Sequence, residues 1–237
     1  MLLFADGSIS GTIGGGEMES RVIKSARAVS HDGEGRVDTY QLVDPANGDP
    51  GVCGGEVDVF VEPIRPEPTL LVIGAGHVGA AIVHLGKWLG FHVILNDDRE
   101  NLCNPESVPG ADRYVVGGVE ELTADVTFHH QIFIVLATRG FPIDLPLLPE
   151  LLNRPHGYLG VIGSLRRWAT AVDELVNQGV SSDALADIHA PMGLELNAET
   201  PKEIAMSILA EIIMLQRGGT GESMQMKADA INRTAVD

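Results

Sequence analysis

The sequence predicts an α/β fold, in which a doubly wound parallel sheet with helices on both faces follows a smaller α+β segment. Three observations predict it. Apolar runs of strand length recur along residues 69–162, and a glycine-rich turn joins the first of them to a helical apolar pattern. A proline-rich stretch separates this part from an N-terminal segment with alternating strands. Continuous apolar runs are typical of buried parallel strands, whereas alternation is typical of half-buried ones.

The stretch from Leu70 to Arg99 gives the strongest signal for this fold. It reads as an apolar run, a glycine turn at residues 74–79, a helical pattern, a second apolar run and Asp97-Asp98-Arg99. Strand, glycine turn, helix, strand and terminal acid follow each other in this order in a dinucleotide-binding, Rossmann-type βαβ unit. The agreement of all five parts predicts such a unit here.

Each glycine of this turn has an expected role. Gly74 is expected to permit the tight turn, Gly76 to let the backbone approach a phosphate, and Gly79 to let the helix pack closely on the strand. The helix starts near His77, and its free N–H groups favour an anion. Asp97 stands where a ribose hydroxyl is normally bound. The alternative is the same fold without a dinucleotide, because a fold alone does not determine its ligand.

Composition limits the class of protein. The 237 residues carry a formal net charge of −17, which would repel nucleic-acid phosphates, so we expect no nucleic-acid partner. No apolar run reaches the ~18 residues that span a bilayer, and no signal segment opens the chain. Two cysteines at unrelated positions give no disulfide framework. We therefore expect a cytoplasmic protein without a membrane partner.

The first residues predict a hairpin, a glycine turn and a helix. Met1–Phe4 and Ile9–Ile13 are strand-like, and Asp-Gly lies between them. Gly14, Gly15 and Gly16 then lead into helical spacing over 17–29. Glycines before a helix N-terminus can form an anion cradle, and the alternative is a plain strand-to-helix connection.

Cys53 is the candidate for sulfur or metal chemistry. It precedes Gly54 and Gly55, between a strand predicted over 36–43 and another predicted over 56–62. A thiolate at a glycine edge can act as a nucleophile or metal ligand. The alternative is a small buried apolar side chain at a turn.

The stretch 63–68, Pro-Ile-Arg-Pro-Glu-Pro, is the clearest linker, since prolines stiffen the backbone and remove donors. It predicts a first domain over 1–62, a second over 69–219 and a flexible tail over 220–237.

After Arg99 the remaining elements of the second domain follow in order. We expect strands over 113–116, 131–137 and 158–162, a weak acidic helix over 118–125, and a proline-broken amphipathic stretch over 142–152. Ser164 is a good N-cap for a helix over 165–178. Thr200-Pro201-Lys202-Glu203 is a capping box for a last helix, which Gly218-Gly219 ends.

Two arginines stand where strands are expected to end. Arg139 follows the apolar run 131–137 and can pair with a phosphate, or form a surface ion pair. Arg166, beside Arg167, lies in a first helical turn, where a positive charge opposes the helix dipole. It therefore suggests an anion or an acidic partner, and the alternative is a solvated helix face. His189, the one histidine of the predicted loop 188–194, is expected to be structural.

Taken together, these stretches resemble the XdhC/CoxI family of molybdenum-cofactor maturation factors. The resemblance covers most of residues 11–216, and the ordered set of pieces is specific although no single piece is. The matching pieces are Gly11–Gly16 with Glu19, Cys53–Glu56 with Glu62-Pro63, Gly74–Gly79, Asp97–Arg99, Thr138–Gly140 with Asp144, Gly160–Ser164, Ile188–Leu194, Thr200–Ala205 with Ser207-Ile208 and Ala210–Ile212.

The resemblance implies a small XdhC/CoxI domain followed by a Rossmann-type domain. It also implies an often dimeric protein that binds the molybdenum cofactor, assists its sulfuration by a cysteine desulfurase, and delivers it to xanthine dehydrogenase or a related hydroxylase. Cys53 would then contact molybdenum or relay sulfur. The family's usual N-terminal helix and strand are not seen in this sequence, so the first domain is expected to be incomplete. Many relatives carry His where this chain has Phe141.

Three functions follow as hypotheses. The first, which we favour, is a cofactor chaperone without turnover of its own. The second is an NAD(P)-dependent oxidoreductase, for which Asp97 favours NAD and Arg99 a 2′-phosphate, although no Tyr-Lys pair for hydride transfer is evident. The third is a module that docks a hydroxylase without binding a cofactor. The expected cofactor-binding residues are Gly14, Gly15, Gly16, Cys53, Gly54, Gly55, Gly74, Gly76, His77, Gly79, Asp97, Arg139, Ser164 and Arg166.

Overall fold

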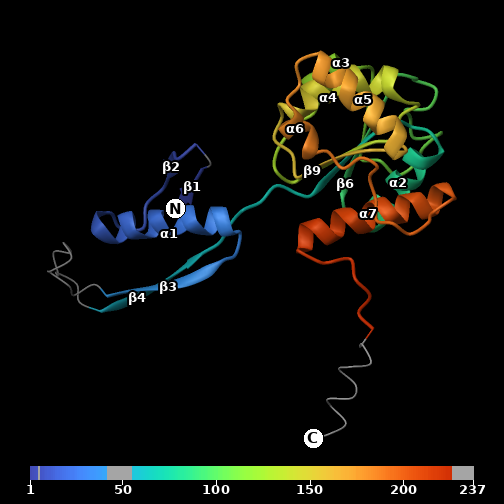
Figure 1. The fold of residues 1–237 in the computed structure, drawn as a ribbon. Coiled ribbons are helices and arrows are strands. Elements are labelled where there is room, and N and C mark those ends of the chain that lie inside the picture. The colour runs from blue at the N-terminus through green and yellow to red at the C-terminus, as the bar shows by residue number, and fades with distance from the viewer. Residues whose placement is uncertain (5, 42–54, 226–237) are drawn as a thin grey trace, which may run out of the picture. The chain divides into compact units, whose positions relative to one another are not determined.

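The computed structural model describes residues 1–4, 6–41 and 55–225. The chain divides into two compact units, Met1–Arg65 and Pro66–Asp237. The division falls inside the proline-rich stretch 63–68. Figure 1 labels the helices and strands.

The first unit is a small α+β structure. Antiparallel pairs join β1 to β2 and β3 to β4. The hairpin predicted around Asp6-Gly7 forms, with shorter strands than expected, and the helix is longer than expected. The elements are β1 (Leu2–Leu3), β2 (Ile9–Ser10), α1 (Gly16–Asp32), β3 (Arg36–Gln41) and β4 (Glu56–Val61). Their buried apolar cluster consists of Val22, Val29, Tyr40 and Val61.

The second unit contains the predicted doubly wound sheet. Five strands lie in the order β7-β6-β5-β8-β9, and all neighbouring pairs are parallel. Sequence order reverses between β5 and β8, which is the switch point at which such sheets bind ligands. The strands are β5 (Thr69–Ile73), β6 (His92–Asp97), β7 (Arg113–Val116), β8 (Ile132–Leu136) and β9 (Tyr158–Val161).

Alternate strand residues build two cores on opposite faces of this sheet. Leu70 and Val72 pack with α2 and α7, whereas Leu71 and Ile73 pack with helices of the other face. In Figure 1 α3, α4 and α5 lie on the side of the sheet away from α7. The helices are α2 (His77–Trp88), α3 (Val119–Asp125), α4 (Phe141–Leu152), α5 (Leu165–Asn177), α6 (Ser182–Ala186) and α7 (Pro201–Arg217).

The predicted helix boundaries of α5 and α7 are confirmed by their caps. The Arg167 N–H donates to Ser164 Oγ at 3.3 Å. Thr200 and Glu203 form the expected capping box, and Gly218 ends α7 in the left-handed conformation. α6 was not anticipated, because its five residues are too few to show a helical period.

One expectation about the second unit was wrong. The stretch 142–152 was expected to be broken by its prolines, but α4 runs through Pro146 and Pro149 as one helix. Pro142 occupies the first turn, where a missing N–H costs nothing. Buried Leu147, Leu148 and Leu151 anchor the helix on the sheet, and this packing outweighs the lost donors.

Among the described residues, no helix has the length and apolar character needed to cross a membrane.

Candidate functional site

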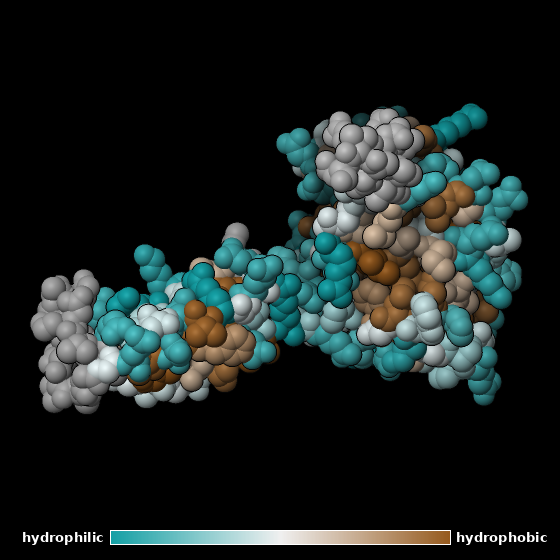
Figure 2. Space-filling model, turned by 90° about the horizontal axis from the view of Figure 1, so that it is seen from below, coloured by the Kyte–Doolittle hydropathy of each residue, from teal (hydrophilic) through white to brown (hydrophobic). Residues whose placement is uncertain are grey.

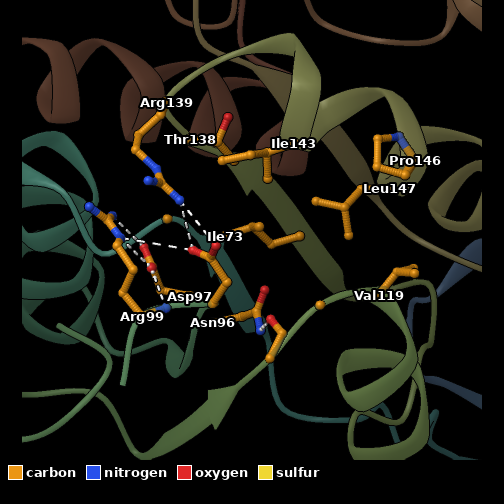
Figure 3. A pocket seen from close by; sticks show the side chains of 14 residues that line it. Ile73, Asn96, Asp97, Arg99, Val119, Thr138, Arg139, Ile143, Pro146 and Leu147 are labelled. Carbon is orange, nitrogen blue, oxygen red and sulfur yellow. Dashed lines mark hydrogen bonds and ion pairs between the residues drawn. The ribbon is translucent and has the colours of Figure 1, made fainter. Parts of the chain in front are cut away.

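A cavity of about 180 Å³ opens at the carboxyl edge of the parallel sheet. Figure 3 shows Asp97, Arg99 and Arg139 on one side of it, and Ile143, Pro146 and Leu147 on the other. The charged side comes from the ends of β6 and β8, and the apolar side comes from α4. The lining residues are Ile73, Gly74, Asn96–Arg99, Gly117–Val119, Thr138, Arg139, Ile143, Pro146 and Leu147.

The glycine turn borders this cavity through Gly74. A side chain on Gly74 would lie 2.5 Å from the Ala137 carbonyl oxygen, and one on Gly79 would lie 1.8 Å from the Gly74 carbonyl oxygen. These two glycines therefore permit the close packing that the sequence suggested. A side chain on Gly76 would meet no atom within 4 Å, and no side chain caps the N-terminus of α2 there. The start of α2 is thus open to an approaching group.

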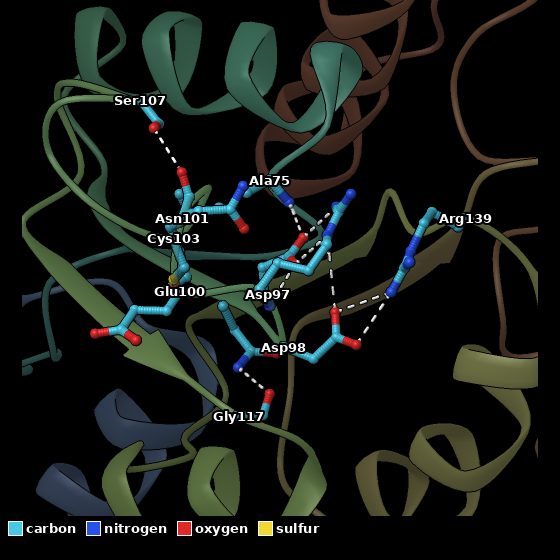
Figure 4. Close-up of polar contacts among 12 residues, drawn as sticks. Ala75, Asp97, Asp98, Glu100, Asn101, Cys103, Ser107, Gly117 and Arg139 are labelled. Carbon is cyan, nitrogen blue, oxygen red and sulfur yellow. Dashed lines mark hydrogen bonds and ion pairs between the residues drawn. The ribbon is translucent and has the colours of Figure 1, made fainter.

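Asp97 is engaged by the protein itself (Figure 4). The backbone N–H of Ala75 donates to its Oδ2 at 2.7 Å, and the N–H of Arg99 donates to its Oδ1 at 2.9 Å. The Arg99 guanidinium adds a bond to each oxygen, both at 2.8 Å. Burial opposes ionisation of this side chain, which is 3% exposed, but these donors outweigh it and hold the pKa of Asp97 well below its usual range.

Arg139 forms the surface ion pair that the sequence left open as an alternative to phosphate binding. Its Nη2 donates to Oδ1 and Oδ2 of Asp98 at 3.1 and 3.0 Å. Both side chains are 55% exposed. Asp98 follows β6 and Arg139 lies just beyond β8, and these strands flank β5, so the pair reaches across the end of the central strand.

Asp144, in the first turn of α4, is a buried acidic side chain that is hydrogen-bonded to Thr138, the neighbour of Arg139. The Thr138 hydroxyl donates to Asp144 Oδ1 at 2.5 Å, and the Gly140 N–H donates to the Thr138 hydroxyl at 3.1 Å. Asp144 is 1% exposed, and burial raises its pKa although Thr138 and Arg167 oppose the shift. These bonds hold the turn from β8 into α4 in place.

The first glycine turn, expected to be an anion cradle for a ligand, binds the chain's own Glu19. The N–H groups of Ile13 and Gly15 each donate to Glu19 Oε2 at 3.1 Å, and the Thr12 hydroxyl also donates to it. The hydrogen bonds from Thr12 and Ile13 hold the pKa of Glu19 below its usual range. The Thr12, Ile13 and Gly15 donors are therefore engaged by Glu19, and a role of Gly14, Gly15 and Gly16 in cofactor binding stays a prediction.

Within the second unit, the predicted residues Gly76, His77, Gly79, Ser164 and Arg166 are not among those that line the cavity. Ser164 caps α5 with its hydroxyl, and Arg166 is exposed in the first turn of that helix. Cys53 and Gly54 lie outside the described residues. Cys103 is buried, and its thiol donates to the carbonyl oxygens of Leu95 and Val115, which agrees with the structural role expected for it. In the described part of the chain no three His, Cys, Asp or Glu side chains gather as a metal site.

Three of the predicted site residues, Gly74, Asp97 and Arg139, come together around the cavity. Sequence reasoning missed its apolar wall on α4, because Ile143 and Leu147 have the pattern of ordinary core residues. It also missed Asn96, whose side-chain amide donates to the carbonyl oxygens of Val115 and Gly117 at 2.9 and 3.1 Å. The signal that could have identified it is its position, since Asn96 is a polar residue directly after the apolar run 93–95 and before Asp97.

Comparisons with known proteins agree on one family. Residues 70–212 match the XdhC Rossmann domain, and residues 1–41 match the XdhC and CoxI family. The chain is 34% identical over 230 residues to the uncharacterized protein YqeB of Escherichia coli, covering 94% of this chain and 41% of that protein.

Two further relatives were found. Over 160 residues the chain is 28% identical to a probable xanthine dehydrogenase subunit of Bacillus subtilis, covering 68% of this chain and 46% of that protein. The chain thus spans less than half the length of the curated relatives it matches. A crystal structure described as a xanthine dehydrogenase from Bacillus halodurans shares the fold, with a TM-score of 0.57 and 20% identity, covering 96% of this chain and 88% of that one.

The family match extends over more than half of the chain, and the sheet order, the glycine turn and the site at the carboxyl edge accord with it. The chain belongs to the XdhC and CoxI family.

Proposed function

We propose that this protein is an accessory factor of xanthine dehydrogenase or a related molybdenum hydroxylase, and that it binds the molybdenum cofactor, assists its sulfuration and inserts it into that enzyme. The observation that carries the proposal is a family match over residues 70–212 that coincides with a cavity of about 180 Å³ at the switch point of the sheet. The Bacillus subtilis relative, a probable xanthine dehydrogenase subunit, supports the choice of partner.

The residues at the carboxyl edge fit an anionic pterin. A phosphate would be attracted to the uncapped N-terminus of α2 at Gly76 and to the exposed guanidinium of Arg139. The apolar wall of α4 would accept a flat ring. When bound, the cofactor would supply the metal centre that the hydroxylase uses. This chain's residues would hold its anionic and planar parts and shield them from water.

Geometry also weighs against the oxidoreductase hypothesis. A dinucleotide-binding unit uses the acid after its second strand to accept the ribose hydroxyls. Here Asp97 already accepts four hydrogen bonds from Ala75 and Arg99. This arrangement favours a ligand held through its phosphate and ring over one held through a ribose.

The test is binding and transfer of the cofactor with the full chain. The purified protein is mixed with molybdenum cofactor, and binding is measured by absorbance after gel filtration. Transfer is then measured by reconstitution of a cofactor-free xanthine dehydrogenase, with and without a cysteine desulfurase. We expect binding by the wild type and less sulfurated product with Cys53→Ala. Cys103→Val is the matched control, because that buried thiol faces backbone carbonyls.

Each alternative predicts a different result. A hydroxylase-docking module would co-purify with the large polypeptide of the enzyme but bind no cofactor. An NAD(P)-dependent enzyme would be stabilised in thermal melting by NAD or NADP, since a ligand of the native state raises stability. Absence of cofactor binding, with wild-type behaviour of Cys53→Ala, would contradict the proposal. A homodimer, which the family resemblance implies, is tested in the same gel-filtration runs.

A further inference from the structure

The first unit contains two short sheets that do not join. Among the described residues β1 pairs with β2 alone and β4 pairs with β3 alone, so β1 and β4 each keep one edge without a strand partner. Figure 1 shows both pairs beside α1. An isolated two-stranded sheet is marginally stable, and a free edge presents backbone N–H and C=O groups that can pair with a further strand.

A groove of about 580 Å³ is bordered by both of these strands. It touches consecutive residues, 1–4 from β1 and 59–65 from the end of β4 onward. Because side chains alternate between the two faces of a strand, contact with consecutive residues places the groove along the strand edges. The remaining lining residues are Gly7 and Ile13, and on α1 Val22, Ala26, Arg27, Val29 and Ser30.

The floor of the groove is apolar and common to both strands. Val22, Val29 and Val61 belong to the buried cluster of this unit, and Met1 and Val59 pack against it. The inward side chains of β1 and β4 therefore rest on the same cluster beside α1. A strand lying in the groove would place its own inward side chains there and join the two sheets into one.

The outer side of the groove is apolar as well. Leu2 and Phe4 on β1 are 49% and 50% exposed, and Phe60 on β4 is 62% exposed. Exposed apolar side chains gathered at one place mark interaction sites. An inserted strand would cover them only with apolar residues on this side too, so its middle part is apolar on both faces.

One end of the groove is basic. Arg27 lies in the last two turns of α1, and a side chain on Gly33, the residue that ends α1, would lie 1.1 Å from Arg65 Nη2. None of the ion pairs among the described residues involves either arginine. Glu62 is the one acidic residue that lines the groove. The lining residues therefore carry a net positive charge in a chain of net charge −17, and an acidic segment is complementary to them.

The occupant is best supplied by a different polypeptide. Every strand in the described part of this chain is already paired in a sheet, so a second copy would have to give up one of its own strands to fill the groove. We propose that the groove between β1 and β4 accepts an extended segment of a partner protein, apolar along its middle and acidic at the end that meets Arg27 and Arg65. Backbone hydrogen bonds to the free edges would supply affinity, and the apolar floor and the arginines would supply selectivity. The proposed function uses the cavity of the second unit, so this partner surface goes beyond it.

The test measures binding of labelled peptides to the full chain by fluorescence polarisation. The probe is Glu-Glu-Val-Thr-Val-Ile-Val-Thr, used also in reversed order so that both strand directions are covered. A probe with lysines in place of the glutamates should bind at least about tenfold more weakly. A probe with N-methyl groups on every second residue keeps the side chains but loses donors along one edge, and its binding should be lost.

Variants of α1 test where the probe binds. Ser30→Trp narrows the groove and should weaken the acidic probe at least about tenfold. Ser20→Trp is the matched control, since Ser20 is also exposed on α1 but does not line the groove. If Ser30→Trp melts early, Arg27→Glu combined with Arg65→Glu replaces it. This double variant should prefer the lysine probe, whereas Lys24→Glu, outside the groove, should not.

Hydrogen exchange gives an independent measure, because amides of β1 and β4 should exchange more slowly when the acidic probe is bound. No binding of either acidic probe would overturn the proposal, as would equal binding of the N-methylated probe. Affinity unchanged in both Ser30→Trp and the double arginine variant would also contradict it. Self-association of the wild type that Ser30→Trp abolishes would assign the groove to a second copy and refute a partner protein.

Discussion

At the scale of the residue, Asp97 ties the glycine turn to the end of β6. It accepts the Ala75 N–H from the turn and pairs with Arg99 two residues further on. Because the side chain is 3% exposed, replacing one of its two acceptor oxygens by an amide NH2 leaves two of these buried donors facing another donor. We expect Asp97→Asn to lower the free energy of unfolding by about 2 kcal/mol or more.

Urea denaturation measures this effect. Asp98→Asn is the control, since this neighbour is 55% exposed and its loss should change stability by no more than about 0.5 kcal/mol. Equal urea midpoints for the two variants would contradict the role given to Asp97.

The low pKa of Asp97 has a consequence for acid stability. The unfolded state has an ordinary Asp pKa of about 3.9 and therefore takes up a proton before the folded state does. The contribution of Asp97 is complete above that value and is lost as pH falls below it. Urea midpoints between pH 7 and pH 3 should fall more steeply for wild type than for Asp97→Asn. Parallel curves for the two proteins would refute this assignment.

The roles of Gly74 and Gly79 could be predicted from the sequence, because a tight strand-to-helix turn needs glycine at fixed positions along a short stretch of chain. Nothing in the sequence indicated that the Glu19 carboxylate would accept hydrogen bonds from the first glycine turn. Nothing in it indicated either that the Arg99 guanidinium would hydrogen-bond to both oxygens of Asp97. Both are side-chain contacts at short range, and a residue type alone does not say whether a donor is bound by the chain or by a ligand.

At the scale of the element, the half-buried carboxylate of Glu211 joins α7 to β9. Glu211 Oε2 accepts the Tyr158 hydroxyl at 2.5 Å and the Gly193 N–H at 2.8 Å. His189 stacks on Tyr158, with ring centroids 4.6 Å apart, and its Nδ1 lies 3.4 Å from Glu211 Oε1. His189 was expected to be structural, and these contacts agree with that expectation.

This contact gives an element-scale prediction. Burial opposes the ionisation of Glu211, but the bonds from His189, Tyr158 and Gly193 hold its pKa below the usual range. Glu211→Gln keeps the shape and removes the charge, so we expect a loss of about 1–3 kcal/mol in the free energy of unfolding. Exposed Glu150→Gln is the control, and the measurement is chemical denaturation at pH 7. A variant as stable as Glu150→Gln would show that the network is dispensable.

The strands of the second unit could be predicted almost to the residue, because their apolar runs and turn residues are local signals. β7 was predicted with the bounds that the structure has, whereas α4 was not recognised as one helix. Proline propensity argued for a break there, and the tertiary packing of Leu147, Leu148 and Leu151 reversed it. Long-range packing of this kind leaves no short pattern in a sequence.

At the scale of the whole molecule, the two units differ in core size. The buried apolar cluster described in 1–65 consists of Val22, Val29, Tyr40 and Val61, whereas the second unit has a large cluster on each face of its sheet. Small cores give marginal stability. Calorimetry of the full chain should therefore show two transitions, and a fragment 66–225 should keep the upper one. If the full chain showed one transition and the fragment 66–225 showed none, the difference in stability between the two units would be contradicted.

Apolar side chains also remain exposed on the second unit. Met206 and Leu215 on α7 are 51% and 43% exposed, and Figure 2, which views the molecule from the side of α7, shows apolar surface on this face. With a formal net charge of −17, association of two copies requires such apolar surface, because the charges repel. The homodimer implied by the family resemblance stays a prediction.

The central claim is that backbone at the start of α2 receives an anionic cofactor. Gly76 has an ordinary φ of −74°, and a side chain there would meet no atom within 4 Å. Gly76→Val should therefore fold but block the approach of a phosphate, whereas Gly219→Val, where a side chain also fits, should not. The decisive measurement is the affinity of both variants for molybdenum cofactor. The account predicts at least about tenfold weaker binding by Gly76→Val alone, and equal affinities would contradict it.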